Sequence, residues 1–411
     1  MIDNFLNTAQ WLKHPDIWPK REELITNFNV RFAGFGSCFA QNIQQIVQPF
    51  GFEYWYQRDV CAHYSAESMA NVLEIVSTGR VMTDDDLIIN AANDGAIISY
   101  PFYFKKRYFG AKGITHVLGR MRSLADQCRR EIQECNVLVL TLGTARVLRL
   151  LRNGKVLNTA AHIGGEFWES EMSSVEDNVR HLNRVFQSVH DIRGGDMPTI
   201  ILTISPQRYL FSNDIEGLDV NPFLDNMLSK SILRVAADNF CKEHTGCVRY
   251  FPSYEVVIDE LRVMESLSHY DFTHIDQKHT PEHVVKKFLQ SYCSDAMLEQ
   301  FTLIEEVRDR KGEMLELLSG GCDAGNSQLT TIMDNLLSKL EAVDGEISPK
   351  IFGYFVDILE EIQNRFGDRS GLPEPWVPFD QRVASLSVSL QRQLGPDDRL
   401  KLFMGMKANQ A

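Results

Sequence analysis

The sequence lacks several features that define large classes of protein. No apolar run approaches the roughly 20 residues that a membrane-spanning helix needs, and no internal repeat or low-complexity tract stands out. The first 20 residues contain no basic stretch, no apolar stretch and no small-residue cleavage site, so no signal peptide is expected. We therefore predict a chain without a membrane span.

Basic residues and paired cysteines are also scarce. Acidic side chains outnumber basic ones by 55 to 42, and the net charge of -13 disfavours nucleic acid or an anionic membrane as the main partner. The eight cysteines include no Cys-x-x-Cys pair, so neither a zinc site of paired cysteines nor a disulfide framework is expected. Scattered thiols of this kind indicate the reducing cytoplasm.

Short apolar segments and helical segments alternate through the first two thirds of the chain. Four segments have the pattern of short or buried strands: 29–36, 136–141, 199–204 and 247–251. Three further segments have helical periodicity: 117–134, 173–190 and 224–244. This alternation predicts an α/β domain whose parallel sheet has helices on both faces, with inserted hairpins at about 95–108 and 145–158.

The pattern changes after about residue 300. Four amphipathic helices are predicted there, without strands: 301–318, 329–343, 349–366 and 383–406. Each helix has an apolar stripe that must pack on another helix, on the α/β domain or on a second subunit. A homo-oligomer is therefore one of the possible assemblies. We predict an α/β domain over 1–298 and a C-terminal helical module over 299–411.

Gly36, Ser37 and Cys38 lie where the first predicted strand gives way to a helix. A serine there projects from the carboxyl end of the sheet, where open α/β folds place their active sites. The N–H groups that begin the helix can stabilise developing negative charge. Ser37 is therefore a candidate nucleophile. Two alternatives stay open: Ser37 can simply cap the helix, and the Cys38 thiol could be the nucleophile.

A serine nucleophile needs a base, normally a histidine that a carboxylate orients. The sequence offers two Asp-x-x-His pairs, Asp271/His274 and Asp276/His279. A helix is predicted to start directly after the second pair, with threonine as its cap and proline next. His279 would then lie on a short loop where both side chains can turn toward one site, so we favour the second pair. Either pair could also be surface residues beside a helix cap.

Other polar residues have two interpretations each. Arg208 follows a predicted central strand and could bind an anionic group of a substrate, or form a structural salt bridge. Ser229 and Lys230 could act as a Ser-Lys dyad, although their place inside a predicted helix favours packing or capping. The aromatic and cationic tract at 102–109 could bind carbohydrate, but a charged hairpin edge is favoured.

Seven short motifs occur in order between residues 30 and 290. They are GSCFA at 36–40, YSAES at 64–68, TLGT at 141–144, TISPQR at 203–208, SK at 229–230, YFPSYE with DELR at 250–262, and DxxH at 276–279. Together they resemble the motifs of the GSCFA family, whose members are relatives of the SGNH (GDSL-type) hydrolases. The C-terminal 110 or so residues have no such match.

The resemblance implies a flavodoxin-like three-layer α/β/α domain of the SGNH-hydrolase type. It also implies a catalytic triad in which Ser37 is the nucleophile, His279 is the base and Asp276 orients the histidine. In SGNH enzymes the nucleophile's own N–H, a glycine N–H and an asparagine side chain hold the oxyanion. The resemblance assigns the two N–H groups to Ser37 and Gly143.

The asparagine of the oxyanion hole is displaced in this sequence. Its usual place, two residues after the glycine, is occupied by Ala145. The implied substitute is Asn158, which matches the first residue of the family's Asn-Cys-His-Lys segment. The sequence departs from that segment by having Ala160 and Ala161 in place of the histidine and the lysine.

The activity that the resemblance implies is acyl-ester hydrolysis on an ester-bearing, carbohydrate-linked substrate, with no cofactor and no metal. If a sugar hydroxyl resolved the acyl-enzyme in place of water, the protein would be an O-acyltransferase, for example an acetyltransferase in polysaccharide biosynthesis, with an acyl donor as a further partner. A non-catalytic carbohydrate-binding or scaffolding protein is the third alternative, and the retained serine, aspartate and histidine disfavour it.

Overall fold

A computed structural model describes the chain in the ranges 17–90, 96–99, 101–102, 104, 108–158, 163, 167–209, 221–261, 280–319 and 327–342, with eight single residues beyond them: 348, 351, 353, 354, 357, 361, 381 and 382. The chain divides into two compact units. The first consists of Met1–Arg21, Asn29–Gln48 and Phe52–Ser291, and the second of Glu22–Phe28, Pro49–Gly51 and Tyr292–Ala411.

A parallel sheet of five strands forms the centre of the first unit. Its spatial order is β11-β10-β6-β1-β2, with the bounds Val248–Phe251, Thr199–Ile204, Val137–Leu142, Arg31–Gly36 and Glu53–Trp55. All six residues of β6 are buried, because helices cover both faces of a parallel sheet. The four strands expected from the sequence are confirmed, and β2 is an addition at the edge.

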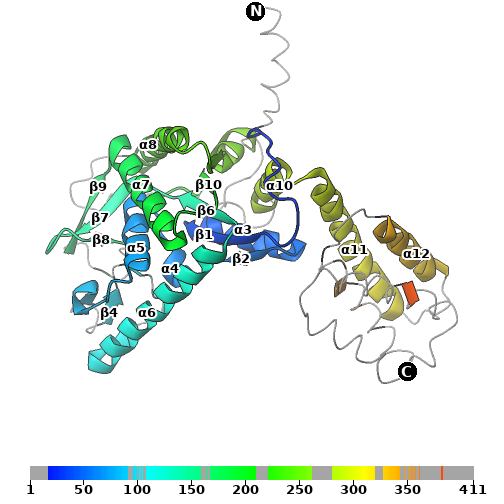
Figure 1. Cartoon of the computed structure of the whole chain (residues 1–411), viewed down its shortest axis with the longest axis horizontal. Coiled ribbons are helices and arrows are strands. Elements are labelled where there is room, and N and C mark those ends of the chain that lie inside the picture. The colour runs from blue at the N-terminus through cyan, green and yellow to red at the C-terminus, as the bar shows by residue number, and fades with distance from the viewer. Residues whose placement is uncertain are drawn as a thin grey trace, which may run out of the picture. The chain divides into compact units, whose positions relative to one another are not determined.

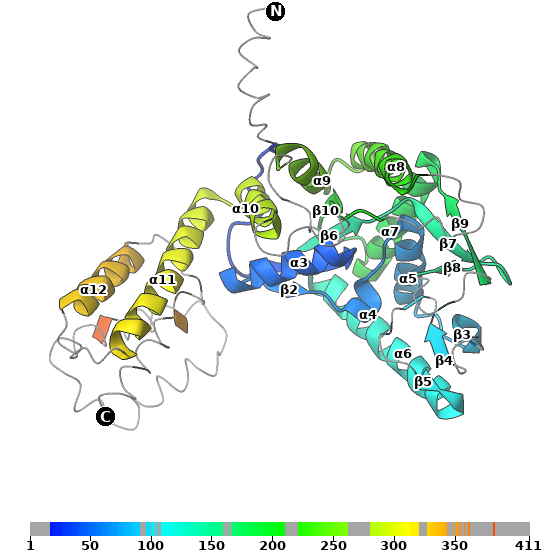
Figure 2. The same cartoon turned by 180° about the vertical axis from the view of Figure 1, so that it is seen from behind.

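Helices lie on both faces of this sheet. On one face are α3 (Cys38–Val47) and α10 (Thr280–Tyr292), which Figure 2 shows in front of the strands. On the other face are α6 (Gly110–Glu134), α7 (Val175–Arg193) and α8 (Pro222–Glu243), with α5 (Ala66–Thr78) packed on α7 (Figure 1). The unit is therefore a mixed α/β fold with helical layers around a central parallel sheet.

Two small antiparallel sheets flank the central one. The first has the order β3-β4-β5, with the bounds Leu87–Asn90, Ala96–Ser99 and Tyr108–Phe109. The second has the order β8-β7-β9, with the bounds Val156–Leu157, Arg146–Leu150 and Trp168–Met172. Both regions where the sequence predicts hairpins are antiparallel, and each gains one strand that the sequence did not predict, β3 and β9.

Short elements complete the first unit and its edges. They are α4 (Arg58–Cys61), α9 (Ser253–Glu255), a π-helical turn (Val256–Glu260) and two 3-10 turns (Gln48–Phe50 and Asp84–Asp86). Among the described helices, none combines the length and the hydropathy of a membrane span.

The second unit contains two long described helices, α11 (Asp295–Ser319) and α12 (Ser327–Glu341), which pack on each other. Phe301 of α11 also contacts the rings of Phe28 and Phe50, at centroid distances of 6.1 and 4.9 Å. Two N-terminal segments are thus part of this unit. The helices expected over 349–366 and 383–406 lie outside the described residues, apart from single positions.

Candidate functional site

The site lies between β1 and β6, where the order in which the chain adds strands to the central sheet reverses. From β1 the chain passes through α3 to β2 on one side, whereas from β6 it passes through α7 to β10 on the other side. Open α/β sheets bind their ligands beyond the carboxyl ends of the strands at such a switch point. Gly36 of β1 and Thr203 of β10 both pair with Thr141 of β6, so the three strand ends are level.

Ser37 follows β1 directly and is the N-cap of α3. Its backbone is extended (φ -67°, ψ 172°), and its Oγ accepts a hydrogen bond of 3.3 Å from the N–H of Phe39. The side chain is fully buried, and the Ser37 N–H donates to the carbonyl of Thr141 at 3.1 Å. The hydroxyl therefore lies at the positive end of α3, beside the strand ends, and the capping interaction is real.

Gly36 makes the turn between β1 and α3 possible. Its φ of 120° is a conformation that side-chain-bearing residues rarely adopt. A Cβ at this position would lie 2.0 Å from the carbonyl oxygen of Thr141. The glycine before Ser37 is thus required by the close approach of β1 and β6.

The segment His63–Tyr64 joins the ends of these two strands. The His63 N–H donates to the Gly36 carbonyl at 3.2 Å, and the Tyr64 carbonyl accepts from the N–H groups of Gly143 and Thr144 at 2.8 and 2.9 Å. The structure therefore brings Ser37 and Gly143 together at the carboxyl ends of β1 and β6. Both of their N–H groups, however, already donate to backbone carbonyls, so neither points at an open oxyanion site.

Lys230 of α8 lies beside the residues that follow β6 and β10, and it is fully buried. Its Nζ donates to the carbonyls of Gly143 and Ser205 at 2.6 and 2.8 Å, and lies 5.2 and 5.9 Å from the ring centroids of Tyr209 and Tyr254. Burial lowers the pKa of Lys230 to about 7. The ammonium thus links the carboxyl ends of β6 and β10.

Ser229 supports the same turn from α8. Its Oγ accepts the Ala145 N–H at 2.7 Å and lies 3.1 Å from the hydroxyl of Thr144. Because Ser229 and Lys230 each hold the backbone after β6, their packing role is confirmed.

Asn158 directly follows β8 in the antiparallel sheet and is 5% exposed. Its Oδ1 and Nδ2 are both buried, and neither has a hydrogen-bond partner among the described residues. A buried polar group without a partner costs about 1–3 kcal/mol. Such a group needs a partner such as a water molecule or a ligand group, so Asn158 stays a candidate for the oxyanion hole.

The remaining members of the expected site are placed as follows. Asp276 and His279 lie outside the described residues, as do Asp271 and His274, and α10 begins at the next residue after His279. Arg208 is half-buried, with its guanidinium 5.7 Å from the ring centroid of Phe223. Its role toward an anionic group stays a prediction.

His63 is a functional candidate that sequence reasoning missed. Its side chain is fully buried, and Nε2 lies 3.1 Å from the Val60 carbonyl oxygen. Within the described part of the chain, Nδ1 has no hydrogen-bond partner. Burial lowers the pKa of His63 to about 4, although the contact with Val60 opposes this. The only signal in the sequence was its place directly before the 64–68 motif.

A metal site was also sought among acidic, histidine and cysteine side chains. Within the described part of the chain, no group of three or more of these residues is arranged to hold a metal ion.

The fold and site define the class as an α/β protein whose parallel sheet carries a strand–glycine–serine–helix turn at its switch point. The family model of the GSCFA family matches residues 31–288, more than half of the chain. The protein therefore belongs to the GSCFA family. A search of curated proteins found no match.

Proposed function

We propose that the protein is a serine-dependent acyl-ester hydrolase of the SGNH type, with Ser37 as its nucleophile. The observation that carries this proposal is the position of Ser37 at the switch point, on a turn that only glycine at position 36 permits. The N-terminus of α3 adds a positive dipole end beside the hydroxyl. A turn held this tightly is expected where one side chain must be presented in a fixed direction.

The proposed mechanism follows from this arrangement. His279, oriented by Asp276, removes the proton as the Ser37 oxygen attacks the ester carbonyl, and then returns the proton to the leaving alcohol. In the second half, His279 removes a proton from a water molecule as its oxygen attacks the acyl carbon, and gives the proton to the Ser37 oxygen as the carboxylic acid is released. Asp276 and His279 are assigned these roles because the 276–279 segment resembles the DxxH motif of the family.

The oxyanion donors need a rearrangement in this proposal. The N–H groups of Ser37 and Gly143 donate to the carbonyls of Thr141 and Tyr64. On substrate binding they would exchange these carbonyls for the oxyanion, whose charge accepts hydrogen bonds more strongly. Among the described residues, none accepts a hydrogen bond from the Asn158 amide, so we propose this amide as the third oxyanion donor.

Covalent labelling tests the nucleophile directly. An alkyl fluorophosphonate phosphonylates a serine that a base has activated, and peptide mass spectrometry locates the modified residue. We expect modification at Ser37, its loss in Ser37→Ala, and strong slowing in His279→Asn. The matched control is Ser174→Ala, which removes the N-cap serine of α7 and should leave labelling unchanged. A folded wild-type protein that is not modified at Ser37 would overturn the proposal.

A further inference from the structure

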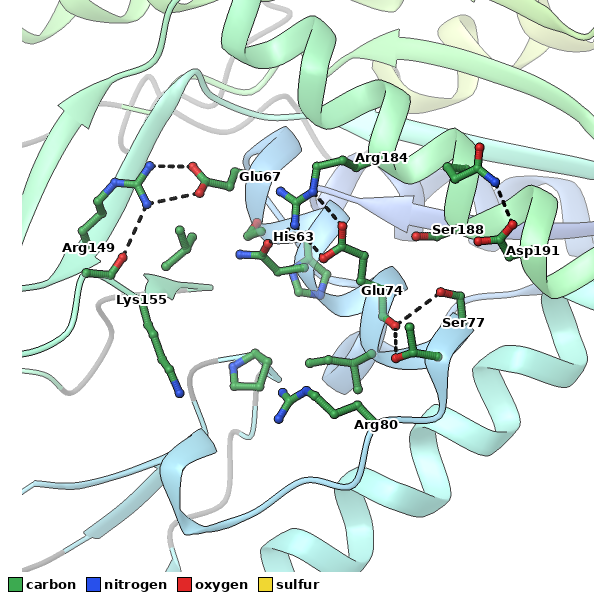
Figure 3. Close-up of a pocket in the computed structure, with 18 residues that line it drawn as sticks. His63, Glu67, Glu74, Ser77, Arg80, Arg149, Lys155, Arg184, Ser188 and Asp191 are labelled. Carbon is green, nitrogen blue, oxygen red and sulfur yellow. Dashed lines mark hydrogen bonds and ion pairs between the residues drawn. The ribbon is translucent and has the colours of Figure 1, made fainter.

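α5 shows the usual arrangement of side chains on a surface helix of the first unit. Its apolar residues are buried, among them Met69, Val72, Leu73 and Val76. Its carboxylates Glu67 and Glu74 line the cavity between α5, α7 and the hairpin of β7 and β8, where Arg149 and Arg184 donate to them at 2.7 Å (Figure 3). Apolar residues thus face the protein and charged residues face away from it.

The first four turns of α8 have the reverse arrangement. The buried residues there include four polar ones: Asp225, Asn226, Ser229 and Lys230. Five apolar side chains are between 50% and 64% exposed: Phe223, Leu224, Met227, Leu228 and Val235. This part of α8 therefore turns its polar side toward the protein and its apolar side outward.

The orientation of α8 is fixed by the contacts of its polar side. Asp225 accepts a hydrogen bond of 2.6 Å from Arg146, and Lys230 donates one of 2.6 Å to the carbonyl of Gly143. A rotation of the helix that buried its apolar side would break these contacts and leave charged groups without their partners. The outward direction of the apolar side chains is thus a consequence of how α8 holds the strand ends.

The exposed apolar residues surround Ser231 and form one continuous surface. Met227, Leu228 and Val235 lie three or four residues from Ser231, so they are its neighbours on the helix. The Oγ of Ser231 donates to the carbonyl of Met227 at 2.9 Å, so this hydroxyl is satisfied within the helix. We call these four residues, together with Phe223 and Leu224, the outward face of α8.

The centre of the outward face is uncharged. Two arginines lie at its edge: Arg234, which donates to Glu255 at 2.9 Å, and Arg208, whose guanidinium is 5.7 Å from the ring centroid of Phe223. Helices that bind a lipid surface usually have many lysines and arginines on their polar side, whereas the polar side of α8 is buried in the protein. An apolar protein surface is therefore the favoured partner.

The size and the chemistry of the outward face suit a second copy of the chain. At these exposures the five apolar side chains present about 500 Å² of surface, as much as the largest apolar patch of a typical monomer. Two such faces together cover about 1,000 Å², the size at which specific interfaces begin. In a two-fold dimer the same surface of both subunits meets, so an uncharged apolar face is complementary to its own copy.

We propose that the outward face of α8 is a homodimer interface, in which α8 packs on α8 of a second copy about a two-fold axis close to Ser231. The proposal does not depend on the chemistry proposed for Ser37, and the Ser37 labelling result leaves it unaffected.

Sedimentation velocity of the full chain, from about 1 to about 200 µM, tests the proposal. We expect a monomer–dimer equilibrium with a Kd of about 1–100 µM, because the interface is small. Leu224→Glu places a carboxylate in the interface and should weaken the dimer at least about 10-fold. In the first turn of α8 this negative charge favours the helix, so the variant should stay folded.

The matched control is Val81→Glu. Val81 lies outside α8 and has the same exposed fraction as Leu224, 64%, so this variant should dimerise as the wild type does. A wild type that stays monomeric at all these concentrations would overturn the proposal, as would a dimer that is equally stable in Leu224→Glu.

Cysteine cross-linking locates the interface. A residue beside a two-fold axis faces its own copy, so Ser231→Cys should form a disulfide between subunits on mild oxidation. The wild type measures the background from the native cysteines. Ser123→Cys, at an exposed position in the middle of α6, is the control and should not exceed that background. A dimer in which Ser231→Cys cross-links no faster than Ser123→Cys would mean that another surface forms the interface.

Neutral lipid vesicles test the other apolar partner. We expect the wild type not to float with phosphatidylcholine vesicles, because its outward face is covered by the second copy. Flotation of a monomeric wild type that is lost in Leu224→Glu would assign the outward face to a lipid surface and overturn the dimer.

Discussion

Acidification should destabilise the protein through His63 by a predictable amount. The imidazole is fully buried, and burial lowers its pKa from 6.5 to about 4. In the unfolded chain the same group takes up a proton from about pH 6.5 downward. The unfolded state therefore binds more protons throughout this window, and the free energy of unfolding falls as the pH falls from about 6.5 to about 4. Above pH 6.5 the stability from this group is fully present.

The magnitude follows from the width of the window. Each pH unit between the two pKa values corresponds to about 1.4 kcal/mol, so complete acidification should cost about 3 kcal/mol through His63 alone. Among the described residues, burial also lowers the pKa values of His181 and His244. Their contribution is the same in a His63 variant and cancels in the difference.

Urea unfolding at several pH values between about 4 and 7 is the appropriate assay. Trp55 and Trp168 lie in the first unit and report on it by fluorescence. His63→Gln has no titrating group at this position, so its stability should fall less steeply with acid, by about 3 kcal/mol over the window. Parallel pH profiles for the wild type and His63→Gln would refute the argument, because they would mean that the imidazole titrates alike in both states.

Three further predictions concern the strand ends. Gly36→Ala places a Cβ against the Thr141 carbonyl at a φ of 120° and should destabilise the protein by about 3 kcal/mol or more in urea unfolding, whereas Gly119→Ala, with nothing within 4 Å of its Cβ, should not. The pKa of buried Lys230 is lowered to about 7 from 10.5, so the unfolded chain binds more protons between these values, and the free energy of unfolding should rise by about 2 kcal/mol from pH 7 to about pH 9. Lys230→Met should lack this rise, and an equal rise in both proteins would contradict the prediction. Asn158→Leu removes two buried unpaired atoms and should raise the free energy of unfolding by about 1 kcal/mol, while ester turnover falls about 100-fold or more; unchanged turnover would remove Asn158 from the oxyanion hole.

The sequence by itself determined the elements whose signals are local. The apolar runs of β6 and β10 predicted two central strands, since a parallel strand buried on both faces has few polar residues. Alternation of apolar and polar residues before Gly36 predicted β1, and a weaker apolar pattern predicted β11. The change of period after Gly36 predicted α3, and the threonine and proline at 280 and 281 predicted the start of α10. The position of Ser37 at the end of a strand followed from these elements alone.

Short strands were beyond the reach of local patterns. β2 has only three residues, Glu53–Trp55, and β9 has the sequence Trp-Glu-Ser-Glu-Met with no buried residue. Their strand character comes from pairing with β1 and β7. Periodicity cannot report a partner strand, so both strands were missed.

Only the tertiary structure decided how the polar groups of the site are used. The Tyr64 carbonyl accepts from Gly143, and Lys230 donates to the same glycine from 87 residues further along the chain. Whether the N–H of Gly143 or Nδ1 of His63 has a hydrogen-bond partner depends on which groups from distant parts of the chain pack beside it. Sequence patterns specify burial and local conformation, but hydrogen-bond partners at such separations are fixed by the packing of β6, α5 and α8 around the strand ends.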